Sequence, residues 1–231
     1  MKLLQTAFAP TVLIAVAIAA SCSGTGAGHN AGQITTREES EPFVIERFDT
    51  ILLDAPDMER EGSLMTALKD RKSTREYSHE ALSRQEVTDL MWAAGGLNRE
   101  GDTIHTTAPS AMARYPIEIY AAFDEGIFRY DKREHALIPV VEGNYMELTG
   151  RQPFVKDASM NLLYIANLAT GSNEKWASVD VGHNAQNVNL YCASEGLGTV
   201  VRGSADADSL LHVMGLDPEQ YVFILAQSVG K

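Results

Sequence analysis

Two arginines and a serine at alternate positions, Arg71, Ser73 and Arg75, have the types and spacing to bind an anion. Alternate side chains of an extended segment face the same way, so the two guanidinium groups and the hydroxyl would share one side. Arginine binds phosphate through paired hydrogen bonds, and this trio is suited to a phosphate dianion. Taken alone, such a segment is also typical of a charged turn in solvent.

Small residues form a second group, Pro109, Ser110 and Ala111, inside a loop predicted over residues 97–115. Proline fixes the backbone, and small side chains let a flat ring approach the main chain closely. Loops of this length inside compact domains are usually functional or disordered. The alternative is a simple turn into the strand that follows.

Five segments occur in an order and spacing that resemble the nitroreductase family of flavin mononucleotide (FMN) enzymes. They are Arg71–Arg75, Trp92–Asn98, Thr107–Ala111, Arg114–Pro116 and Gly196–Thr199. Each segment is common by itself, and their combination carries the resemblance. It covers residues 63–231 and is closest in pattern to the short nitroreductase-like branch that includes azoline dehydrogenases of peptide natural-product pathways.

The resemblance implies a set of cofactor-binding residues. They are Arg71, Ser73, Arg75, Pro109, Ser110, Ala111, Val201, Arg202, Gly203, Ser204 and Lys231. The first three would hold the FMN phosphate and ribityl chain, and the next three would pack against the isoalloxazine ring from the partner subunit. Backbone N–H groups of Gly203 and Ser204 would face flavin N5 and O4, where donors stabilise the reduced ring. Lys231 would add charge at the phosphate. No catalytic side chain is implied, because the flavin carries the chemistry.

An FMN-dependent oxidoreductase, working as a homodimer with shared active sites, is the implied function. A reduced nicotinamide, NADH or NADPH, would give hydride to flavin N5, and a nitroaromatic, quinone or similar small-molecule acceptor would take it. Two alternatives remain open. One is a flavin-dependent dehydrogenase or oxidase of an organic or peptide substrate on the same fold. The other is a lipid-anchored binding protein that has lost turnover.

Local patterns predict the elements that must position these residues. Helices are predicted over 63–69, from the capping box at Ser83 to Gly95, and over 176–195 and 206–214. Strands are predicted over 117–123, 126–130, 136–141, 161–166 and 221–229. Because strands and helices do not alternate regularly, the pattern indicates an α+β fold with a mainly antiparallel central sheet flanked by helices. The resemblance implies the same architecture.

Composition and charge narrow the function classes. The 231 residues, 45% of them hydrophobic, are enough for one domain with a full core. A net charge of −12 without a basic cluster makes nucleic acid an unsuitable partner. No spacing of His, Cys and Asp predicts a metal site. Cys192 stands at helical spacing with Val181, Ala185 and Val188, which predicts a core residue rather than a redox thiol.

The N-terminal residues differ from the rest of the chain. Lys2 precedes an uncharged apolar run, and small residues stand just before Cys22. This pattern predicts a lipoprotein-type signal peptide over residues 1–21, a lipidated Cys22 and a flexible tether over residues 22–42. Residues 43–231 would then form the nitroreductase-like FMN domain, outside the cytoplasm of a bacterial cell envelope and held to a membrane through the lipid alone. The alternative is an ordinary cleaved signal with an incidental cysteine.

Overall fold

A computed structural model describes residues 41–99, 101 and 104–231. The predicted signal peptide, the predicted lipidation site Cys22 and all but the last two residues of the predicted tether lie outside the described residues. Those that are described belong to one compact unit. No described helix is long and apolar enough to cross a membrane.

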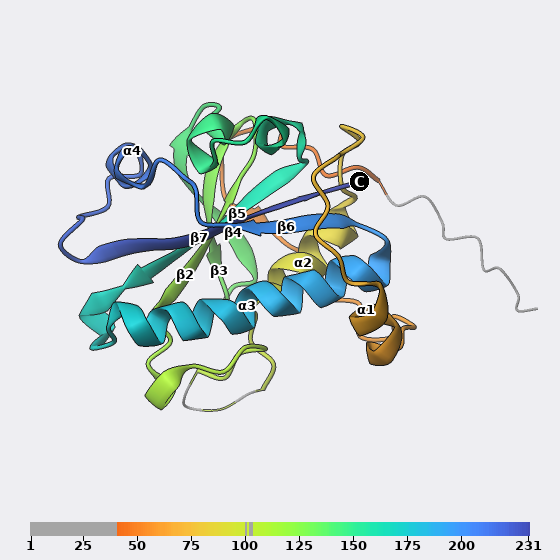
Figure 1. Cartoon of the computed structure of the whole chain (residues 1–231), viewed down its shortest axis with the longest axis horizontal. Helices are drawn as coiled ribbons and strands as arrows, with labels where there is room; N and C mark the ends of the chain where they lie inside the picture. Colours follow the sequence, from red (N-terminus) through yellow and green to blue (C-terminus); the bar gives the residue numbers. More distant parts are fainter. Residues whose placement is uncertain (1–40, 100, 102–103) are drawn as a thin grey trace, which may run out of the picture. The chain divides into compact units, whose positions relative to one another are not determined.

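One seven-stranded sheet forms the centre of this unit, in the order β1-β4-β3-β2-β5-β7-β6, and every neighbouring pair is antiparallel (Figure 1). The strands are β1 (Ile51–Leu52), β2 (Ile117–Ala122), β3 (Gly126–Asp131), β4 (Ala136–Glu142), β5 (Met160–Asn167), β6 (Gly198–Arg202) and β7 (Tyr221–Gly230). The predicted α+β class and mainly antiparallel sheet are therefore confirmed. Strands β1 and β6 are not among the strands that the sequence predicts.

Helices cover both faces of the sheet, with α3 running along one face and α4 lying on the other (Figure 1). The α-helices are α1 (Leu64–Asp70), α2 (Arg84–Gly95), α3 (Glu174–Glu195) and α4 (Ala207–Val213). Short 3₁₀ helices are η1 (Ala111–Ala113), η2 (Met146–Thr149), η3 (Pro153–Asp157) and η4 (Leu168–Thr170). The four predicted helices are thus present, with ends that differ from the prediction by one or two residues.

Alternation along the strands builds two apolar cores. In β5, Leu162 and Tyr164 face the core under α2 and α3, whereas Leu163 and Ile165 face the core under α4 and η2. The central strands are therefore buried on both sides, which explains why β5 reads as a continuous apolar run.

Helix α3 carries the predicted buried stripe of Val181, Ala185, Val188 and Cys192. It ends at Gly196, whose φ of 73° is in the left-handed region that glycine adopts most readily. Burial raises the pKa of the Cys192 thiol, so this cysteine packs as a core residue, as predicted.

Candidate active site

A groove of about 710 Å³ opens where α1, the C-terminal end of α3 and the last residue of the chain meet. Its lining includes Arg71, Lys72, Thr74, Gly198 and Lys231. Backbone hydrogen bonds hold its outer wall, since the N–H of Thr74 donates to Thr199 O at 2.9 Å and the N–H of Ser78 to Lys231 O at 2.7 Å. The volume lies in the range of pockets that enclose cofactors and other small ligands.

Positive charge dominates this groove. Within the described part of the chain, neither Arg71 nor Arg75 forms an ion pair. The ammonium of Lys231 lies 3.5 Å from the carboxylate of Glu86, the residue that completes the capping box of α2. Unpaired guanidinium groups beside a groove are suited to an anion such as a phosphate.

Only one residue of the predicted trio lines the groove. Arg71 lines the groove, whereas Ser73 and Arg75 are exposed and do not line it. Thr74 instead faces the sheet, and a Cβ at Gly198 would lie 2.9 Å from the methyl carbon of Thr74. The side chain of Thr74 therefore occupies the space that a side chain at position 198 would need, whereas Ser73 and Arg75 on either side of it are exposed.

At the end of β6, Arg202 is a buried anchor rather than an exposed cation. Its guanidinium is buried and donates to Thr149 O and to Asn161 Oδ1, each at 2.6 Å. Burial lowers the pKa of Arg202 to about 10. A Cβ at Gly150 would collide with this guanidinium, so Gly150 and Arg202 fit together as a pair. The side chain of Arg202 is bonded inside the protein, so of the predicted cofactor-binding groups of this residue only the backbone is available to a ligand.

The two residues after Arg202 present free backbone donors. Gly203 is exposed, and a Cβ there would meet no heavy atom within 4 Å. The side chain of Ser204 donates to Gln152 at 2.9 Å, and its carbonyl accepts from the N–H of Arg151 at 3.2 Å. Neither the N–H of Gly203 nor that of Ser204 donates to another described residue. Two unused N–H groups beside open space match the donors expected at a flavin ring. Val201, the remaining predicted residue of this group, is half-buried against the core under α3.

Pro109, Ser110 and Ala111 lie in a different part of the molecule, against the N-terminal half of α3. The carboxylate of Asp180 accepts from the Ser110 hydroxyl at 2.6 Å and from the Ala111 N–H at 3.0 Å. Pro109 itself is exposed. Asp180 holds this segment, whereas Cys192 lines the groove. The two residues are twelve positions apart on α3, which is about 18 Å along the helix axis. One chain therefore does not bring Pro109 to the groove of Arg71.

Asp180 is the residue of this region that the sequence prediction missed. A signal for it exists, because Asp180, Asn184 and Asn187 repeat at helical spacing beside the apolar stripe of α3. Asn184 Nδ2 donates to Ala94 O at 2.6 Å, and Asn187 Nδ2 donates to Thr107 O at 3.2 Å. Polar residues at a buried helical face indicate backbone partners from another segment.

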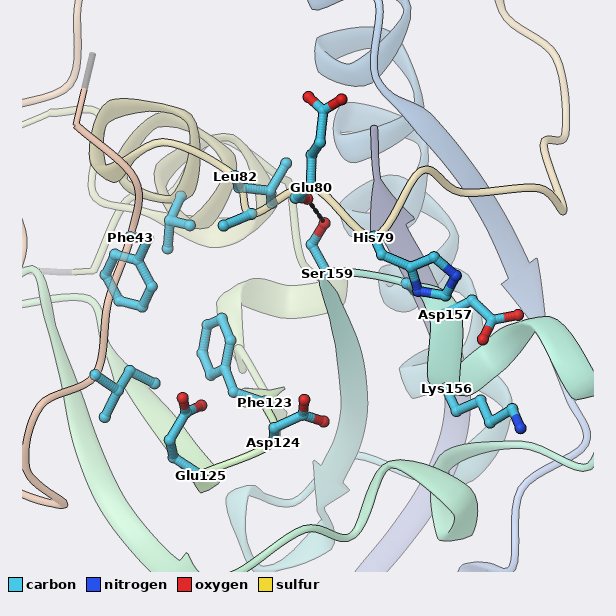
Figure 2. A pocket seen from close by; sticks show the side chains of 14 residues that line it. Phe43, His79, Glu80, Leu82, Phe123, Asp124, Glu125, Lys156, Asp157 and Ser159 are labelled. Atoms are coloured by element: carbon cyan, nitrogen blue, oxygen red, sulfur yellow. Dashed lines mark hydrogen bonds between the residues drawn. The ribbon is translucent and has the colours of Figure 1, made fainter. Parts of the chain in front are cut away.

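A second cavity, of about 240 Å³, lies between the N-terminal segment, η3 and the β2–β3 turn, and contains none of the predicted site residues (Figure 2). Phe43 and Phe123 form its apolar wall, with ring centroids 5.3 Å apart. Its lining carries four carboxylates but only one lysine, contributed by Glu80, Asp124, Glu125, Asp157 and Lys156. This excess of negative charge makes the cavity unsuited to a phosphate group. Among the described residues, no group of three or more His, Cys, Asp or Glu side chains is placed to hold a metal ion.

Comparisons with known proteins identify the family of the chain. A curated protein of Methanocaldococcus jannaschii, named as a nitroreductase, is 33% identical over 172 residues, which cover 68% of this chain and 85% of that protein. A solved structure from Ralstonia eutropha JMP134, described as a nitroreductase, is 35% identical, covers 83% of this chain and 93% of its own, and has a TM-score of 0.74.

A more distant solved structure, from Desulfovibrio desulfuricans, is described as a nitroreductase in complex with FMN. It is 21% identical, covers 74% of this chain and 87% of its own, and has a TM-score of 0.56, so this likeness shows the fold alone. Residues 68–231 match the sequence profile of the nitroreductase family. The chain therefore belongs to the nitroreductase family of flavin oxidoreductases, as its motifs predict.

Proposed function

We propose that the protein binds FMN and, as a homodimer, passes reducing equivalents from NADH or NADPH to a nitroaromatic, a quinone or a similar small acceptor. The observation that carries this proposal is the combination of an unpaired arginine in the groove with two free backbone N–H groups beyond β6. Bound FMN would supply the hydride chemistry, which no side chain of this site needs to perform.

Each part of the site would have a distinct task. Arg71 and Lys231 would neutralise the phosphate, with Ser73 and Arg75 contributing from the adjoining segment. The N–H groups of Gly203 and Ser204 would hold negative charge that develops on the ring. Arg202 would fix this turn from inside the protein through Thr149 and Asn161.

Exposed apolar side chains near α3 support a dimer. Leu64, Met65 and Leu68 on α1 are exposed near the C-terminal end of α3. Met112, Trp176 and Val179 are exposed around its N-terminal half. In a two-fold dimer each patch would cover the other patch of the partner. The same pairing would bring the exposed Pro109 to the groove of the partner subunit. Within one chain, about 18 Å of helix α3 separates the Pro109 segment from the groove.

Flavin identity tests the proposal directly. The cationic groove is suited to the single phosphate of FMN. Residues 43–231, purified and then denatured, are expected to release FMN on chromatography. Release of FAD, or no flavin after incubation with FMN, would refute the proposal.

Donor and acceptor need a separate measurement. Anaerobic stopped-flow mixing of the FMN-loaded protein with NADH or NADPH should bleach the flavin absorbance, and a nitroaromatic or a quinone should restore it. If neither nicotinamide reduces the flavin but an organic or peptide substrate does, the protein is a dehydrogenase or oxidase on the same fold. If no donor reduces a tightly bound flavin, the binding protein without turnover is supported instead.

A further inference from the structure

Asp180 is a buried carboxylate that binds one segment, the loop of residues 107–115, here called the Pro109 loop. The residue is 2% exposed. Its Oδ2 accepts from Ser110 Oγ at 2.6 Å, and its Oδ1 accepts from the N–H of Ala111 at 3.0 Å. It has no ion-pair partner among the described residues. Burying a carboxylate is unfavourable unless hydrogen bonds compensate, so these two bonds fix where the loop lies.

The hydroxyl of Ser110 also joins the two ends of the segment from Ser110 to Tyr115. Ser110 Oγ accepts from the N–H of Tyr115 at 2.8 Å. Within this segment, Met112, Ala113 and Tyr115 have φ values of 56°, 53° and 44°, in the left-handed region that residues other than glycine rarely adopt. A backbone of this kind persists when surrounding contacts hold it in place, and such conformations cluster at functional sites.

Packing fills the inner side of the Pro109 loop. The cavity between the loop, α3 and β2 holds only about 20 Å³, which leaves room for about one water molecule. Asn187 Nδ2 donates to Thr107 O at 3.2 Å and fixes the start of the loop to the same helix. On the outer side, Pro109 is exposed and Met112 is 79% exposed. The loop therefore presents its proline away from its own subunit.

We propose that Asp180 is a positioning residue for the flavin site of the partner subunit. It holds Ser110 and Ala111 so that the Pro109 loop contacts the partner's flavin ring, without touching the cofactor itself. The inference rests on the proposed function, because it requires bound FMN and a dimer with shared sites. A helix residue in one subunit thereby sets the surroundings of the cofactor in the other.

The first experiment compares the wild type with Asp180→Ala, Asp180→Asn and the matched control Ser178→Ala. Ser178 is exposed on the same helix, and its hydroxyl bonds only within that helix, to Glu174 O at 2.8 Å. FMN affinity is measured by titrating the apo-protein, and the ring environment by visible circular dichroism of the bound flavin. Thermal unfolding of each variant reports whether the fold survives.

Asp180→Ala is expected to weaken FMN binding by about tenfold or more, because the loss of the two hydrogen bonds releases the Pro109 loop from the position in which it contacts the flavin. Its bound flavin should also show a changed visible dichroism. Asp180→Asn retains an oxygen for the Ala111 N–H, and the Ser110 hydroxyl can rotate to accept from the new amide. The FMN affinity and the dichroism of this variant should therefore lie close to the wild-type values. Ser178→Ala should match the wild type. Affinity within about twofold and an unchanged dichroism for Asp180→Ala would overturn the proposal.

If Asp180→Ala fails to fold, Ser110→Ala replaces it, because this variant removes the same bond from the loop side and leaves α3 intact. The same changes in affinity and dichroism are then expected. A folded Ser110→Ala protein with wild-type affinity and dichroism would overturn the proposal.

Action across the subunits is tested with a mixed dimer of Asp180→Ala and Arg71→Ala chains, purified through two different tags. One site of this dimer combines an intact groove with an intact Pro109 loop, and the other site lacks both. One FMN per dimer should therefore bind with wild-type affinity and dichroism. Absence of any such site would show that Asp180 acts within its own subunit and refute the proposal. Failure of the wild type itself to bind FMN would refute the proposed function instead.

Discussion

Single side chains set the charge of the groove, and Arg75 tests how far the family motif applies to this chain. It is exposed, lies beside the groove without lining it, and has no ion-pair partner among the described residues. A charged-turn residue in solvent would have the same surroundings. The motif, in contrast, implies that Arg75 binds the cofactor.

Arg75→Ala is expected to weaken FMN binding by about 10- to 100-fold, because a charged hydrogen-bond partner is lost. The fold should survive, since this side chain is exposed. Titration of apo-protein with FMN measures the change. Arg47→Ala is the matched control, as Arg47 is an exposed arginine in the segment before β1, at the opposite edge of the sheet from β6. Affinity within about twofold of the wild type would assign Arg75 to a solvated turn.

Among the secondary-structure elements, α2 connects the stability of the fold to the groove. Its N-cap Ser83 accepts from the N–H of Glu86 at 3.1 Å, and the Ser83 N–H donates to the Glu86 carboxylate at 2.7 Å. The same carboxylate pairs with Lys231. The helix cap is therefore linked to the groove through Lys231, which lines it.

Ser83→Ala is expected to lower the free energy of unfolding by about 1 kcal/mol, because a buried helix cap is removed. Chemical denaturation of the apo-protein measures it. Ser63→Ala at the N-cap of α1 is the matched control, since Ser63 is exposed and accepts from Thr66 at 3.4 Å, near the limit for a hydrogen bond. A smaller loss is expected there. Equal losses at both caps would show that the burial of Ser83 adds nothing.

At the scale of the whole molecule, the separation of the two predicted halves of the site along α3 predicts that a second subunit completes the site. Light scattering on residues 43–231 is expected to give twice the monomer mass, with an interface on the order of 2,000 Å². Val179→Asp, which charges an exposed apolar position of α3, should yield monomers that lose FMN. Leu52→Asp, at an exposed position on the far edge strand β1, should remain dimeric. A flavin-loaded wild-type monomer at micromolar concentration would contradict shared sites.

Attachment to a membrane is a further prediction for the whole chain, and it concerns residues outside the described part. We propose that Cys22 is lipidated and that the acyl chains hold the domain at a membrane, each buried methylene contributing about 0.8 kcal/mol. Full-length protein expressed in a bacterial host should sediment with membranes, and Cys22→Ser should not. Wild-type protein in the soluble fraction, cleaved at the same bond as Cys22→Ser, would support an ordinary secretory signal.

The sequence by itself determined the helices, most of the strands and the family. Capping boxes, helix-ending glycines and apolar periodicity act over a few neighbouring residues, so Ser83, Gly196 and the stripe from Val181 to Cys192 could be recognised in the linear chain. The motif order likewise predicted which segments form the site. The two-residue strand β1 carries too little periodicity to be found in this way.

Tertiary structure alone decided which of these residues remain free for a ligand. The guanidinium of Arg202 is occupied by Asn161, 41 positions away, and Ser110 is held by Asp180, 70 positions away. It also placed Thr74, rather than its neighbours Ser73 and Arg75, against the sheet. These pairings depend on how strands and helices pack across the sheet, and no local pattern records them. A buried polar side chain forms its hydrogen bonds within the protein and is no longer available to a ligand. Which predicted residues can bind a ligand was therefore decided by the folded chain.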